Sequence, residues 1–126
     1  MEKQGILVAD KYTALLKEVT DHFSDAGYHV ETTNSAVRVI SNILQKQTPV
    51  VLLGSDFDKK KDLLEMVRLL KKCNRHLAVI LVSDEASLPV VKRIRKEGIF
   101  YYAMRPVTPE DTNEIKQAVE CALRAA

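Results

Sequence analysis

Residues able to do chemistry directly follow four of the five short apolar runs in this 126-residue chain. Converging carboxylates can hold a divalent cation and accept a phosphoryl group, whereas ammonium and guanidinium groups attract anions. A serine hydroxyl is a poor nucleophile unless a base lies beside it. The residues concerned are Asp10, Lys11, Ser55, Asp56, Ser83 and Arg105.

The elements that must position these residues follow from the hydrophobic pattern. Short apolar runs at 6–9, 28–32, 50–53, 77–82 and 100–104 alternate with amphipathic helical segments. Three of the runs are continuously apolar, which is typical of strands buried on both faces of a parallel sheet. Five such units predict a single α/β domain over residues 1–126, a doubly wound, three-layer fold. Ligands bind such folds at the carboxyl ends of the strands, where the residues above fall.

Local signals support these boundaries. Gly27 and Gly98 follow the first and fourth predicted helices, where a left-handed residue is favoured. Ser35 is the predicted N-cap of the second helix, and Thr108 that of the fifth. Leu44 is predicted to lie on the buried face of the second helix.

Several classes of function are excluded or disfavoured. The chain has neither a G-x-G-x-x-G sequence nor a P-loop, its three histidines are scattered, and no nucleophile elbow is present, so we expect no enzyme and no zinc site. A net charge of +2 gives no argument for nucleic acid, and the longest apolar run is too short to span a membrane. Cys73 and Cys121 have no paired spacing, so we expect a reducing, cytoplasmic location and no disulfide framework.

Over essentially its whole length the chain resembles the receiver domain of two-component response regulators. Residues 6–11 are similar to the family's first strand and the two Mg²⁺-binding acids that end it. Ser55 stands in the place of the phosphoacceptor aspartate, Ser83 in that of the hydroxyl residue, Tyr102 in that of the aromatic switch residue and Arg105 in that of the lysine before proline. The resemblance implies a five-stranded parallel sheet of flavodoxin-like topology, order 2-1-3-4-5, and a role in bacterial phosphorelay signalling.

The departures from the family pattern bear on function. Lys11 replaces an acid, Ser55 replaces the phosphoacceptor and Arg105 replaces lysine, so the charges of Asp10, Lys11, Ser55 and Arg105 sum to −1 + 1 + 0 + 1, or +1. A pocket with one carboxylate and two cations disfavours Mg²⁺. We therefore expect a pseudo-receiver that is not phosphorylatable, holds no metal or other cofactor, and acts through protein–protein interaction.

Two alternatives stay open. A one-residue bulge after residues 50–54 would bring Asp56 rather than Ser55 beside Asp10, giving a working phosphoacceptor with Mg²⁺. In the other alternative Lys11 and Arg105 attract an anion or small ligand to a metal-free pocket, and the chain is a sensor. Under the main reading Arg105 is a structural cation that pairs with Asp10.

The partner surface is expected on the fourth helix, fifth strand and fifth helix, where the resembled family docks partners. Basic residues gather on the fourth helix and acidic residues on the fifth, a pattern that suits a two-fold homodimer. The expected partners are a second copy, another protein or a fused output domain. Nucleic acid and membranes are not expected to bind this domain.

Overall fold

Five parallel strands form one sheet in this computed structural model, which describes residues 5–9, 13–46, 48–54, 63–84 and 88–125. The strands lie in the order β2-β1-β3-β4-β5, so the predicted fold class and topology are confirmed. Their bounds are β1 (Gly5–Ala9), β2 (His29–Thr33), β3 (Val50–Gly54), β4 (Ala78–Ser83) and β5 (Tyr101–Met104).

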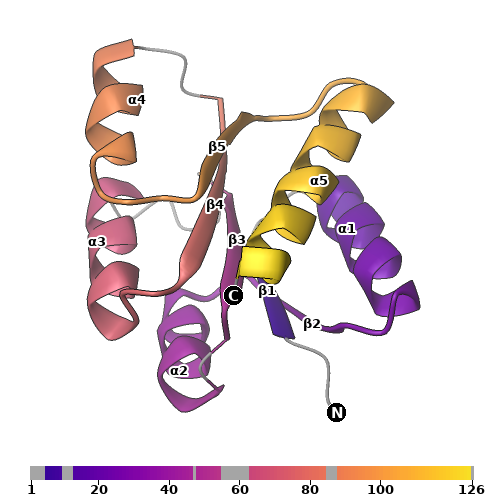
Figure 1. Cartoon of the computed structure of the whole chain (residues 1–126), viewed down its shortest axis with the longest axis horizontal. Helices are drawn as coiled ribbons and strands as arrows, with labels where there is room; N and C mark the ends of the chain where they lie inside the picture. The colour runs from indigo at the N-terminus through magenta and orange to yellow at the C-terminus, as the bar shows by residue number, and fades with distance from the viewer. Residues whose placement is uncertain (1–4, 10–12, 47, 55–62, 85–87, 126) are drawn as a thin grey trace.

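The helices cover both faces of the sheet (Figure 1). Two of them, α1 (Thr13–Asp25) and α5 (Pro109–Ala125), lie side by side on one face. The other three, α2 (Ala36–Lys46), α3 (Leu63–Cys73) and α4 (Leu88–Arg95), cover the opposite face. Within the described ranges, no helix is both long enough and apolar enough to cross a membrane.

The central strands are continuously apolar because each of their faces packs against helices. On β3, Val50 and Leu52 belong to the core beneath α1 and α5, while Val51 and Leu53 belong to the core beneath α2, α3 and α4. All four side chains are fully buried. Strand β2 reads as a weaker run because it lies at the sheet edge and its residues are exposed or half-buried.

The predicted helix ends are also found. Gly27 and Gly98 have positive φ angles of 93° and 84°, the left-handed region that residues with a Cβ rarely adopt. Ser35 Oγ accepts a hydrogen bond from the Arg38 N–H at 3.4 Å, as an N-cap residue does. The prediction for Leu44 is wrong: it is 57% exposed, because α2 meets the sheet through Val39 and Ile43.

A reciprocal cap begins α5. The Asp111 N–H donates to Thr108 Oγ1 at 3.3 Å, and Asp111 Oδ2 accepts from the N–H groups of Val107 and Thr108 at 2.9 and 3.1 Å. These backbone donors hold the pKa of the Asp111 carboxyl below its ordinary value of 3.8.

Replacing Asp111 by asparagine is expected to lower the melting temperature in a pH-dependent way. Because the pKa is depressed in the folded state, the stabilisation is present above the unfolded-state pKa of 3.8 and is lost as the pH falls through the lower folded-state pKa. Thermal melts from pH 7 to pH 2 should therefore show that the difference in melting temperature between wild type and Asp111→Asn shrinks as the pH falls. Glu110→Gln, at the neighbouring first-turn acid, is the control. A difference in melting temperature of equal size at pH 7 and pH 2 would contradict the stabilising role of the Asp111 carboxylate.

Candidate functional site

The carboxyl ends of the strands meet at one edge of the sheet, as parallel register requires. The last residues of β3 and β4 are close to level, with Gly54 opposite Val82, and Ser83 is level with Met104 at the end of β5. Ala9 at the end of β1 lies opposite Leu53. The residues that follow these strands are therefore the ones to examine for chemistry.

Ser83 and Arg105 are held next to each other at this edge. The Arg105 N–H donates to the Ser83 carbonyl oxygen at 3.0 Å, which continues the β4–β5 pairing one residue beyond Met104. The Ser83 side chain is buried. The structure thus brings together two of the residues singled out in the sequence.

The Arg105 guanidinium lies largely inside the protein, with its side chain 12% exposed, and its Nε is 3.6 Å from Asp84 Oδ2. Asp84 was assigned no role from the sequence, although it directly follows Ser83. A mostly buried guanidinium is stabilised by an adjacent carboxylate, since an isolated buried charge is costly. Arg105 therefore places a fixed positive charge at the carboxyl edge of the sheet.

Asp10, Lys11, Ser55 and Asp56 lie outside the described residues, and so does the predicted pairing of Arg105 with Asp10. The strands that precede them end at Ala9 and Gly54. Across the described ranges, no three His, Cys, Asp or Glu side chains gather closely enough to hold a metal ion. The histidines are exposed, and Cys73 and Cys121 are free thiols.

Tyr102 is half-buried and packs against the core beneath α2, α3 and α4. The preceding residue, Tyr101, packs against the core beneath α1 and α5. Its hydroxyl forms a short hydrogen bond to Glu114 Oε1 on α5. This hydrogen bond to a carboxylate, together with partial burial, raises the pKa of the Tyr101 hydroxyl. The two tyrosines tie β5 to helices on opposite faces of the sheet.

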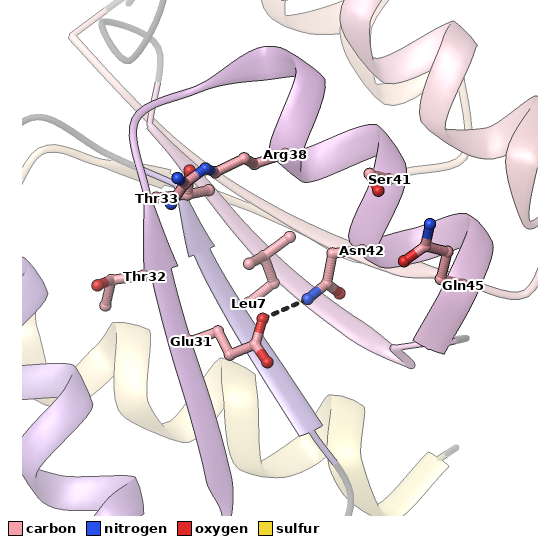
Figure 2. Close-up of a pocket in the computed structure, with 8 residues that line it drawn as sticks. All are labelled: Leu7, Glu31, Thr32, Thr33, Arg38, Ser41, Asn42 and Gln45. Atoms are coloured by element: carbon pink, nitrogen blue, oxygen red, sulfur yellow. Dashed lines mark hydrogen bonds between the residues drawn. The ribbon is translucent and has the colours of Figure 1, made fainter.

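A pocket of about 240 Å³ opens between edge strand β2 and helix α2 (Figure 2). Leu7 and the carboxylate of Glu31 line it from the sheet, and the amide of Asn42 faces Glu31 from the helix. Asn42 Nδ2 donates to Glu31 Oε2 at 2.5 Å, and Asn42 Oδ1 accepts from the buried Thr48 hydroxyl at 2.5 Å. Glu31 Oε1 lies 3.1 Å from His29 Nε2. These polar groups satisfy one another, so the pocket is built as a structural network.

Replacing Asn42 by alanine is expected to lower the free energy of unfolding by about 1–2 kcal/mol, because the buried Thr48 hydroxyl loses its acceptor and Glu31 loses a donor. The gain in helix propensity offsets part of this loss. Urea denaturation of wild type and Asn42→Ala measures the net change in the free energy of unfolding. Gln45→Ala removes an exposed amide one turn along the same helix and should change stability by less than about 0.5 kcal/mol. Equal effects of the two variants would contradict the network.

Comparisons with known proteins relate this fold to that of response regulator receiver domains. No protein-family model matches the chain, and no curated protein matches it by sequence. Among solved structures, a CheY-like response regulator receiver domain protein from Methanospirillum hungatei aligns over 99% of this chain and 100% of its own, with 23% identity and a TM-score of 0.79. A receiver domain from Clostridium thermocellum aligns over 97% of this chain and 95% of its own, with 25% identity and a TM-score of 0.77.

The same fold also occurs as one part of a longer chain. NtrX from Brucella abortus aligns over 98% of this chain but only 26% of its own length, with 20% identity and a TM-score of 0.77. These likenesses establish the receiver fold for the described strands and helices.

Proposed function

We propose that this chain, which has the fold of response-regulator receiver domains, is a signalling module that takes up no phosphoryl group and acts by binding a protein. The observation that carries the proposal is the set of residues at the carboxyl edge of the sheet. Strand β3 ends at Gly54 and is followed by Ser55, a hydroxyl residue, where a phosphoacceptor needs a carboxylate. Arg105 contributes a guanidinium to the same edge.

The residues that follow β1 and β3 in the sequence are not a set of ligands that suits Mg²⁺. The ion prefers oxygen ligands with negative charge, whereas Asp10 is followed by Lys11 and Ser55 is neutral. At an effective dielectric of about 20, unit charges about 4 Å apart interact by about 4 kcal/mol, and a divalent ion doubles the repulsion from one ammonium. Without bound Mg²⁺, the Lewis-acid contribution of a metal ion to phosphoryl transfer is missing.

The protein-binding face is proposed on α4, β5 and α5. Large apolar side chains are exposed along it at Leu88 and Val90 on α4, at Met104 on β5 and at Val107, which is 91% exposed. Basic residues fill the last turn of α4, and acidic residues the first turn of α5. Exposed apolar groups on elements that also carry charges of both signs suit a self-complementary contact between two copies.

A Mg²⁺ titration followed by two-dimensional NMR tests the loss of the metal site. The amide signals of Ser83, Asp84 and Arg105 report on the carboxyl edge, and those of Asn42 and Thr48 are an internal reference. We expect no saturable shift at the edge up to millimolar Mg²⁺. A saturable shift confined to the edge signals would overturn the proposal.

Sedimentation equilibrium tests the docking face. We expect concentration-dependent association that Val107→Asp abolishes. Val37→Asp, at an equally apolar and 75% exposed position on α2, should leave it unchanged. A chain that stays monomeric at all concentrations would remove the homodimer from this proposal.

A further inference from the structure

A second pocket, of about 300 Å³, lies at the opposite end of the sheet from Ser83 and Arg105. It opens where β4 and β5 begin, between the C-terminal ends of α3 and α5. Its volume is at the lower limit of small-molecule sites, which span about 300–1,000 Å³. Its lining includes Pro49, Lys71, His76, Ile99, Phe100 and Ala122.

Lys71 supplies the pocket's half-buried cation. Its Nζ donates to the Leu77 carbonyl oxygen at 2.9 Å, which uses one of three ammonium donors. No carboxylate among the described residues lies within ion-pair distance of it. Burial lowers the pKa of the Lys71 ammonium. In the pocket of Figure 2, by contrast, the polar side chains of Glu31 and Asn42 hydrogen-bond to each other.

The surrounding sequence makes this end of the sheet positive. Residues 66–83 contain no acid, and their basic residues are Arg68, Lys71, Lys72 and Arg75, with His76 beside them. Only the charge of Arg68 is matched in the described structure, by Glu97 at 2.8 Å. An anion that enters the pocket meets the Lys71 ammonium, which pairs with no carboxylate among the residues that the structure describes.

The rest of the lining is apolar. Ile99 is half-buried, Phe100 is 41% exposed, and Ala122 and Pro49 add small hydrophobic surfaces. Phe100 is held in place by its backbone N–H, which donates to the Val79 carbonyl oxygen at 2.8 Å. An apolar ligand body would cover surface that is now exposed to water.

We propose that this pocket binds a small organic monoanion with an apolar body, such as an arylalkyl carboxylate. The carboxylate pairs with the Lys71 ammonium, with the His76 ring at the rim, and the apolar body packs on Phe100 and Ile99. The site is separate from the carboxyl edge of the sheet, so it stands or falls independently of the proposed loss of phosphoryl chemistry.

The test is a titration of the whole chain with 3-phenylpropionate, followed by two-dimensional NMR and calorimetry. Two further probes divide the ligand into its parts: acetate keeps the charge without the apolar body, and 3-phenylpropionamide keeps the body without the charge. We expect saturable shifts at Leu77, Gly98 and Phe100 with 3-phenylpropionate, and binding at least about tenfold weaker for each partial probe.

Two matched variants locate the charge. Lys71→Met should weaken 3-phenylpropionate binding at least about tenfold, whereas Lys72→Met, which removes an exposed ammonium outside the pocket, should change it less than about twofold. Phe100→Ala removes the apolar wall at a partly exposed position that is not required for the core, and should also weaken binding.

The proposal is overturned by any of three results. These are the absence of saturable binding, equal losses in Lys71→Met and Lys72→Met, or equal affinity for the acid and the amide. Melting curves establish that each variant is folded.

Discussion

Replacing Leu81 by alanine is expected to lower the free energy of unfolding by about 3–4 kcal/mol, a large share of the roughly 5–15 kcal/mol that stabilises a domain. Leu81 has no solvent exposure and lies on β4, between Leu53 on β3 and Tyr102 on edge strand β5. The lost methyl groups leave a cavity that strands held by neighbours on both sides cannot close. Guanidinium denaturation followed by circular dichroism measures the change.

Leu44→Ala is the matched control, because it removes the same atoms from a side chain that is 57% exposed on α2. Its expected effect is below about 0.5 kcal/mol. If the two variants lost equal stability, Leu81 would not be in a close-packed core and the assigned strand register would be wrong.

Substituting Lys11→Asp together with Ser55→Asp is expected to make a chain that takes up a phosphoryl group from acetyl phosphate when Mg²⁺ is present. The formal charge changes by −2 at position 11 and −1 at position 55, or −3 in total. This removes the ammonium that repels the cation and supplies a carboxylate nucleophile. Intact-mass spectrometry should show the labelled fraction at least about tenfold above that of the control.

The control is Lys11→Asp with Ser55→Asn, which has nearly the same shape but lacks the nucleophile. Label that appears equally in the control would have to reside elsewhere, and the role inferred for position 55 would be wrong. Label in neither variant would contradict the inference that Lys11 and Ser55 are what prevents phosphoryl uptake.

Most of the fold could be predicted because the signals for it are local. Continuous apolar runs such as 50–53 mark strands that are buried on both faces, and Gly27, Gly98 and Ser35 mark helix ends. The exposure of Leu44 could not be predicted, because a helix on the flank of a sheet buries a narrower stripe than its apolar residues suggest.

The site was less predictable because its contacts join distant segments. The sequence singled out Ser83 and Arg105, but not that Asp84 lies beside the guanidinium. The network of Glu31, Asn42 and Thr48 gave no sequence signal, since each is a common surface residue type. Lys71 likewise reads as one of several solvated lysines until the fold brings Gly98 next to it and Phe100 into the same pocket.

The loss of phosphoryl chemistry is tested most directly on the unaltered chain, by intact mass after incubation with acetyl phosphate and Mg²⁺. We predict an unchanged mass, and no shift of the Ser83, Asp84 and Arg105 amide signals with beryllofluoride. A chain that gains one phosphoryl group, and loses that gain in Asp56→Asn, would contradict it and identify Asp56 as a working acceptor.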